Sequence, residues 1–265
     1  MSQMNVGATR RSRWNDDSLR VGVPAVLIAL ASIGWWWAVR MAADMDSSTG
    51  DMPGMGPMSG TEVLSLGAFL VAWLAMMTAM MFPAVWPVVQ LYGRAAAGGG
   101  LAPLPVFVVG YIAVWTSIGL PAYVAWRALM DPIADGRAWA GRLAGVVLVA
   151  AAIWQVTPLK AVCLRHCRSP MSLFMRFGSS VTRPFGALRM GVSHGLYCFG
   201  CCWALMAVLV AVGTMNLAWM AGLTLLILLE KNAPQGERIA LAAAAVFVVL
   251  GTVLVVDPST LTAVT

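Results

Sequence analysis

The sequence predicts an all-α fold, a polytopic transmembrane helix bundle of about seven spans with a cytoplasmic amino terminus. Three observations lead to this expectation. Of the 265 residues, 60% are hydrophobic and only 11% are charged, whereas about 25% of residues are charged in an ordinary soluble domain. The mean hydropathy is +0.80. The apolar residues also gather in runs that are long enough, or nearly so, to cross about 30 Å of hydrocarbon.

The apolar runs define the expected membrane spans, which we place at Val21–Ala42, Val63–Tyr92, Leu104–Leu129, Trp139–Lys160, Phe185–Gly213, Asn216–Glu230 and Arg238–Val256. The first run follows four arginines, but further runs come after it and no small-residue cleavage site is evident. We therefore interpret it as a retained span and not as a cleaved signal peptide. The sixth run is short and nearly continuous with the fifth, so a tight hairpin, a re-entrant segment, and six or eight spans are the alternatives.

The charged residues of the loops orient these spans. Basic residues gather in the amino-terminal tail, at Arg94, and between the fourth and fifth spans, where Lys160, Arg165, Arg168, Arg176 and Arg183 lie. The first and third loops instead carry most of the aspartates. By the positive-inside rule, the amino terminus is cytoplasmic and the carboxyl terminus lies outside. We therefore attribute the net charge of +6 to topology and expect no nucleic acid as a partner.

The most informative stretch is Gly195–Met206, GLYCFGCCWALM, which holds three of the five cysteines in an otherwise apolar run. If the run is helical, one face carries four potential ligands at i, i+4 spacing, namely His194, Cys198, Cys202 and Met206. Cys201 lies one residue from that stripe. Thiols and a thioether without carboxylates suit Cu(I), with zinc or iron as weaker fits.

A second group of sulfur residues lies in the second span. Met76 with Met80, and Met77 with Met81, are i, i+4 pairs on adjoining helix faces, so several thioethers can meet a neighbouring helix. Pro83, and Pro87 after it, are expected to kink the helix or free carbonyls just beyond the methionines. The alternative is that these methionines only fill an irregular helix interface.

The remaining two cysteines, Cys163 and Cys167, follow the fourth span at its cytoplasmic end. Their Cys-x-x-x-Cys spacing presents both sulfurs on one helix face, and we expect the neighbouring Arg165 and Arg168 to lower their pKa and favour thiolate. Metal capture and thiol redox chemistry both follow from this arrangement. The arginines can equally serve topology or bind anionic lipid.

Two further candidates lie among apolar residues. Glu230 closes the sixth span and is either a metal ligand or proton site, or half of an ion pair with Lys231, Arg238 or an arginine of the fourth loop. His194 is either a ligand or proton carrier, or it makes an interhelical hydrogen bond beside the small-xxx-small pattern of Gly191 and Gly195. Asn216 is expected to cap the helix that follows it.

The loop after the first span is rich in Met, Gly, Pro and Asp, and its methionines are Met41, Met45, Met52, Met55 and Met58. Thioethers remain ligands in an oxidising compartment, so this loop is a candidate collector of Cu(I). A variable linker that happens to be rich in methionine is the alternative.

Together, the motifs at residues 76–83, 163–168, 194–206 and 215–220, with Glu230-Lys231, resemble the bacterial family of predicted metal-binding integral membrane proteins, a domain of unknown function with a Cys-x-Gly-Cys-Cys-Trp motif. The resemblance spans roughly Glu62 to Val256. It implies a metal, a bacterial membrane and several helices, but no established reaction. The matching positions are the second-span methionines, the five cysteines, His194 and Glu230.

These expectations divide the chain into a basic cytoplasmic tail (1–20), a first transmembrane span (21–42), an outer loop (43–61), a metal-binding multi-helix membrane domain (62–256) and a short outer tail (257–265). The expected location is the cell inner membrane. The expected partners are the lipid bilayer, a metal ion, favoured to be copper, and a metallochaperone or partner membrane subunit.

Three classes of function are compatible with the sequence. In the first, the protein handles or transports a soft metal such as Cu(I) through its Met and Cys sites. In the second, a Cys/His/Met-bound metal performs catalysis on a small or lipid-soluble substrate. In the third, the cysteines serve thiol redox chemistry or the assembly of another metalloenzyme. We rank metal handling first because it uses every sulfur group, and the sequence does not decide whether the protein is an enzyme.

Overall fold

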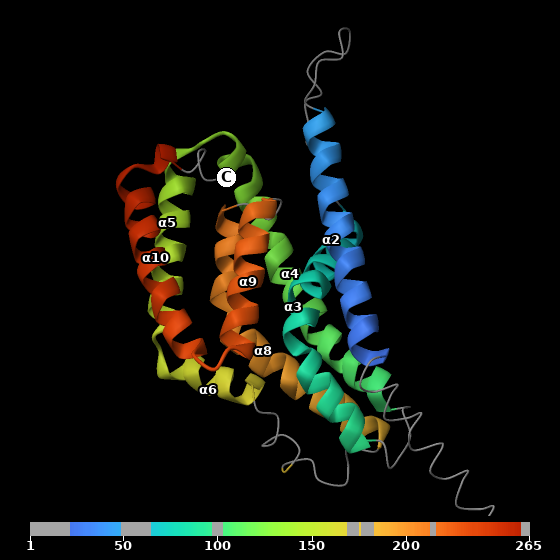
Figure 1. Cartoon of the computed structure of the whole chain (residues 1–265). Helices are drawn as coiled ribbons and strands as arrows, with labels where there is room; N and C mark the ends of the chain where they lie inside the picture. The colour runs from blue at the N-terminus through green and yellow to red at the C-terminus, as the bar shows by residue number, and fades with distance from the viewer. Residues whose placement is uncertain are drawn as a thin grey trace, which may run out of the picture.

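The described part of the chain is entirely helical, which confirms the all-α expectation (Figure 1). The computed structural model describes residues 22–48, 65–96, 103–168, 175, 183–212 and 216–260. Its helices are α2 (Val23–Ser48), α3 (Leu66–Ala96), α4 (Pro103–Ala134), α5 (Ala138–Gln155), α6 (Pro158–Arg168), α8 (Pro184–Val212), α9 (Leu217–Asn232) and α10 (Gly236–Val256), followed by a 3₁₀ turn, η4 (Pro258–Thr260).

Within the residues that the structure describes, five helices are long and apolar enough to cross a membrane, and they indicate a multi-pass membrane protein. Their apolar segments are Leu66–Gly93, Leu104–Ile133, Ala138–Gln155, Pro184–Val212 and Gly236–Val256. The apolar part of α2, Pro24–Arg40, is shorter, and α9 has only 16 residues. The count of seven spans, which includes these two, stays a prediction.

The fourth expected span, Trp139–Lys160, is divided in the structure. Helix α5 ends at Gln155, and after two residues Pro158 begins α6, a separate helix. Proline suits the first position of a helix, where its missing N–H has no intrahelical partner to lose. The break turns Lys160 inward, so that only 1% of its surface is exposed. Lys160 is therefore not the loop charge that we expected.

One other boundary differs from expectation. Helix α2 continues to Ser48, into the segment expected to be an outer loop, and the remainder of that loop lies outside the described residues. Helix α3 includes both Pro83 and Pro87, and the kink or freed carbonyls expected there stay a prediction. Each proline removes only one backbone hydrogen bond of the ladder, and membrane helices tolerate this where neighbouring helices support them.

Helix α8 lies at the centre of the bundle and packs on α4, α5, α6 and α9. It approaches α4 where both helices carry glycine. A Cβ atom on Gly191 would lie 2.1 Å from the carbonyl oxygen of Phe107, and one on Gly110 would lie 2.5 Å from that of Leu188. The expected close packing around Gly191 and Gly195 is confirmed, because Gly195 also faces α4 at Val114.

The other main pairs are α5 with α10 and α2 with α3, at opposite sides of the bundle (Figure 1). Helix α3 makes its main backbone contacts with α2, α4 and α9, and the indole N–H of Trp73 on α3 donates to the carbonyl of Trp115 on α4 over 2.9 Å. Helices α3 and α8 thus share α4 as a neighbour. Asn216 caps α9 as expected, since its side chain accepts from the N–H of Trp219.

The two ends of the bundle differ in which segments they hold. The start of α2, the end of α3, and α6 lie at one end, and the α4–α5 connection and η4 lie at the other (Figure 1). Arg165 and Arg168 of α6 belong to the first end, whereas Asp131 and Asp135 belong to the second.

The glycine crossing of α4 and α8 generates the first testable prediction. Gly191→Ala should destabilise the protein by about 1–3 kcal/mol, because the added methyl group must displace the backbone at Phe107. Thermal unfolding in detergent measures this. Gly222→Ala is the control, since a Cβ there meets nothing within 4 Å. Equal melting temperatures for the two variants would contradict the assigned crossing.

Candidate metal centre

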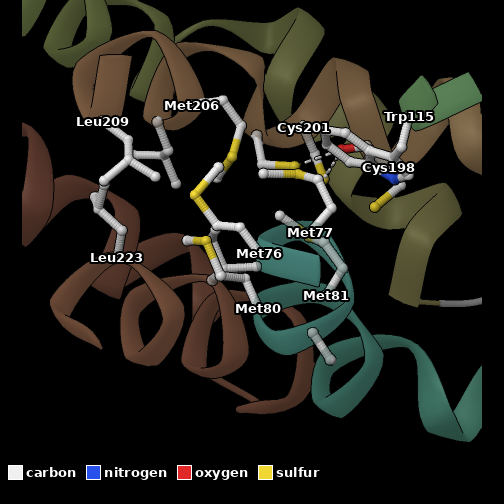
Figure 2. Packing of buried hydrophobic residues seen from close by; sticks show 14 of the residues in the cluster. Met76, Met77, Met80, Met81, Trp115, Cys198, Cys201, Met206, Leu209 and Leu223 are labelled. Carbon is white, nitrogen blue, oxygen red and sulfur yellow. Dashed lines mark hydrogen bonds between the residues drawn. The ribbon is translucent and has the colours of Figure 1, made fainter. Parts of the chain in front are cut away.

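Eight sulfur-bearing side chains are buried between α3 and α8, and we call them the sulfur cluster. Each is at most 9% exposed, and the members are Met76, Met77, Met80, Met81, Cys198, Cys201, Cys202 and Met206. Figure 2 shows the thioethers of Met76, Met80 and Met206 pointing toward one another, with Cys198 and Cys201 beside Met77. The two sulfur stripes predicted from helical spacing therefore do face each other.

Long side chains make this meeting possible. Because α3 and α8 make their main backbone contacts with other helices, the space between them is filled by side chains. Unbranched thioethers reach across such a gap and adapt to it, because methionine has three rotatable bonds and a polarizable sulfur. The sulfur cluster is thus a soft-ligand environment whose members can shift around an ion.

The thiols extend the cluster toward α6. The Sγ atoms of Cys201 and Cys167 lie 3.7 Å apart. The thiols of Cys201 and Cys202 donate to the carbonyl oxygen of Cys198 over 3.0 and 2.8 Å. Cys163 is half-buried, and its Sγ would lie 2.8 Å from a Cβ on Gly200. The absence of a side chain at Gly200 therefore gives Cys163 its place against α8.

The arginines of α6 do not act on these cysteines as we expected. The guanidinium of Arg168 donates to the carbonyl of Ala233, and Nε of Arg165 donates to the carbonyl of Ala161. Burial, with a smaller contribution from Cys201, raises the pKa of the Cys163 thiol above its usual range. The expectation that the neighbouring cations lower this pKa is wrong, because their charges are directed elsewhere.

Two polar groups that sequence reasoning missed converge on Cys198. The ammonium of Lys231 donates to Cys198 Sγ over 3.0 Å and lies 3.8 Å from Met81 Sδ. The hydroxyl of Tyr111 lies 3.1 Å from the same Cys198 sulfur. Lys231 continues the buried stripe of α9 that includes Leu223 and Ile227. That spacing was the signal that could have placed Lys231 inside the bundle.

Glu230 is engaged outside the sulfur cluster. Its Oε2 accepts from Lys160 Nζ over 2.7 Å, and its Oε1 accepts from Gln155 Nε2 over 2.9 Å. All three side chains are buried. The sequence left open an ion pair for Glu230 with Lys231, Arg238 or an arginine, but its partner is Lys160, because the break after α5 directs Lys160 inward.

His194 is only 1% exposed, and neither ring nitrogen has a hydrogen-bond partner among the described residues. Its ring stacks on Tyr111, with the centroids 5.9 Å apart. The cavity beside it, of about 10 Å³, also touches Phe107 and Phe82. The expected interhelical hydrogen bond is thus not seen within the described parts. A buried imidazole without partners is costly, and it keeps a free nitrogen for a ligand.

The donor set restricts how a metal can be held. Within the described ranges, no group of three or more His, Cys, Asp or Glu side chains is arranged to hold a metal ion. The thiols therefore need other donors, and the thioethers of α3 and α8 are the groups beside them. A site built in this way fits a soft ion. The methionines of the outer loop lie outside what the structure describes, so their role as collectors stays a prediction.

The buried charge pair generates the second prediction. Lys160→Met should cost about 3–5 kcal/mol of stability, because it leaves the Glu230 carboxylate buried without its cation. Arg137→Met is the control, since Arg137 and Asp135 are more than half exposed and their pair contributes about 1 kcal/mol or less. Thermal unfolding in detergent again measures both. Similar losses in the two variants would contradict the assigned pair.

Comparison with known proteins bears on the chemistry of this centre. A family model described as PpoB2, copper chaperone, matches residues 70–254, which run from α3 to α10 and include the whole sulfur cluster, Lys231 and α6. No curated protein and no solved structure matches the chain. The family match covers more than half of the chain and confirms copper handling. The protein belongs to the PpoB2 copper chaperone family.

Proposed function

We propose that the protein is a membrane-embedded Cu(I) chaperone, which holds the ion in the sulfur cluster and exchanges it through Cys167 and Cys163 on α6. One observation carries the proposal. Sulfur side chains from α3, α8 and α6 form a buried series that leads from Met206 and Met80 to the half-buried Cys163. Copper is the cargo of this series and not a resident cofactor.

The chemistry of the donors favours Cu(I) over other ions. Thiols and thioethers select soft ions, while Mg²⁺ and Ca²⁺ require oxygen ligands. The carboxylate of Glu230, which is next to Lys231 in the sequence, is engaged with Lys160 and Gln155. Zinc fits less well, because structural zinc sites use four Cys or His ligands, and no such group is arranged among the described residues.

The spread of the sulfurs favours transfer over permanent storage. An ion that must leave again needs several sites of moderate strength, and thioethers along a path supply these better than one closed four-thiolate site. Cys167 contacts Cys201 over 3.7 Å, and Cys163 is the cysteine with the most access to the surface. We therefore place the exchange with a metallochaperone or partner subunit at α6.

The proposed membrane arrangement has seven spans, with α2 and α9 added to the five long apolar helices, and the location is the inner membrane of a bacterial cell. The positive-inside rule then puts the amino terminus and α6 on the cytoplasmic side. This is supported by the position of α6, with Arg165 and Arg168, at the same end of the bundle as the start of α2 (Figure 1).

The third prediction tests the cluster as the copper site. Met80→Leu and Cys198→Ser should each weaken Cu(I) binding at least about tenfold, since changes to groups that only support ligands already cost 10–100-fold. Purified protein is titrated with Cu(I) under anaerobic, reducing conditions against a colorimetric chelator. Met130→Leu is the control, because Met130 lies about 22 Å along α4 from Trp115, which borders the cluster. Failure of the wild-type protein to retain stoichiometric copper would refute the proposed function.

The fourth prediction tests the exchange route. Cys163→Ser should keep bound Cu(I) but slow its transfer to an external chelator on the order of tenfold, because one step of the path is removed. Stopped-flow absorbance of the chelator complex measures the rate. Val162→Ser is the control, because Val162 is 43% exposed on the same helix and carries no sulfur. Equal rates in wild type and Cys163→Ser would show that copper leaves elsewhere.

A second candidate function rests on the 3.7 Å contact between Cys167 and Cys201. Two thiols this close on different helices can form a disulfide by exchange with a partner disulfide, which is reduced to a dithiol, and the reverse exchange restores the two thiols. Mass spectrometry after thiol alkylation separates the two functions. Recovery of a Cys167–Cys201 disulfide that exchanges with a dithiol, in protein that binds no copper, would favour thiol exchange.

A further inference from the structure

We infer that Lys231 determines the charge selectivity of the copper site, so that the cluster accepts a monovalent ion and rejects divalent soft ions such as Zn²⁺. This inference rests on the proposed function of the sulfur cluster and adds the residue that sets its specificity. It starts from a lysine that is 6% exposed and whose ammonium points at sulfur atoms on two other helices.

The surroundings of Lys231 hold it among the proposed copper ligands. Its Nζ lies 3.0 Å from Cys198 Sγ on α8 and 3.8 Å from Met81 Sδ on α3. The Tyr111 hydroxyl, on α4, reaches the same Cys198 sulfur from 3.1 Å. The ammonium therefore lies directly beside two of the proposed copper ligands, Cys198 and Met81.

No carboxylate neutralises this ammonium in the described structure. The neighbouring Glu230 binds Lys160 and Gln155 instead, and the other ion pair of the described residues, Arg137 with Asp135, lies at the exposed α4–α5 turn. Burying an ammonium without an anion is unfavourable. The sulfur of Cys198 is the group that lies closest to this ammonium, at 3.0 Å, among its hydrogen-bond partners in the described residues.

The consequence for a metal ion is electrostatic. An ion bound by Cys198 and the methionines lies close to Lys231, and the repulsion between the two doubles when the ion carries two charges instead of one. Burial strengthens this effect, because the low-dielectric interior screens charges poorly. The thioethers are neutral and cannot offset the second charge. Lys231 thus penalises Zn²⁺ more than Cu(I) at the same ligands.

The experiment compares affinities as a ratio. Cu(I) and Zn²⁺ are each titrated into purified full-length protein, under anaerobic conditions, against colorimetric chelators. Lys231→Met should lower the Cu(I)-over-Zn²⁺ preference at least about tenfold, and Lys231→Arg, which keeps the charge, should leave it within about threefold of wild type. Lys231→Gln carries the same expectation as Lys231→Met and replaces it if that variant does not fold.

Lys160→Met is the matched control. Lys160 is also a buried lysine, but its partner is Glu230 and not the sulfur cluster. Its loss should reduce stability and leave the ratio unchanged. A purely structural role for Lys231 would lower both affinities together, and an effect on thiol protonation would shift both in the same direction, so neither reproduces the expected change in ratio.

The outcomes separate this inference from the proposed function. Wild-type protein that binds Cu(I), together with an unchanged ratio in Lys231→Met, would overturn the inference and leave the copper site in place. Wild-type protein that binds no Cu(I) would overturn both. A lowered ratio in Lys231→Met, with the ratio retained in Lys231→Arg and Lys160→Met, would support it.

Discussion

The close crossing of α4 and α8 is the constraint on which the rest of the centre depends. At Gly110 and Gly191 the two backbones approach so closely that no side chain fits between them. This crossing fixes the direction of α8, while α3 is held against α4 through the hydrogen bond from Trp73 to Trp115. The gap that remains between α3 and α8 is filled by methionines and cysteines (Figure 2). Glycine packing in one place therefore creates the sulfur cluster in another.

The bundle buries two lysines and treats them differently. Lys160 is paired with the carboxylate of Glu230, which also accepts a hydrogen bond from the carboxamide of Gln155, and these three residues join α5, α6 and α9. Among the described residues, the ammonium of Lys231 has only sulfur partners, and it lies beside the proposed copper ligands. Neighbouring residues of α9, Glu230 and Lys231, thus face different surroundings. This difference is consistent with a structural role for the ion pair between Lys160 and Glu230, and with the proposed role of Lys231 in selecting the charge of the bound ion.

The apolar composition and the long apolar runs were sufficient to predict the all-α fold. Helical spacing was sufficient to predict the two sulfur stripes and the glycine packing of α8, because both depend on residues three or four apart on one helix, which is information that a sequence carries locally. The break after Gln155 was missed because an apolar run continues across it. The inward turn of Lys160 and the contact of Lys231 with Cys198 were missed for a related reason. Both are pairings between distant helices, and the packing of the bundle decides them.

The pKa of Cys163 illustrates the same limit. Two arginines within five residues predicted a thiolate, yet their guanidinium groups bind carbonyl oxygens at Ala161 and Ala233. Proximity in sequence indicated a charge environment that the helix packing did not produce. In a bundle with so few charges, the direction of each charged side chain decides the local chemistry more than its position in the chain does.

X-ray absorption at the copper edge of Cu(I)-loaded wild-type protein tests the central claim most directly. Ligation by the sulfur cluster predicts a first coordination shell dominated by sulfur, which loses scattering amplitude in Met80→Leu and in Cys198→Ser. A shell dominated by nitrogen or oxygen, or a sulfur shell that neither substitution changes, would contradict the account.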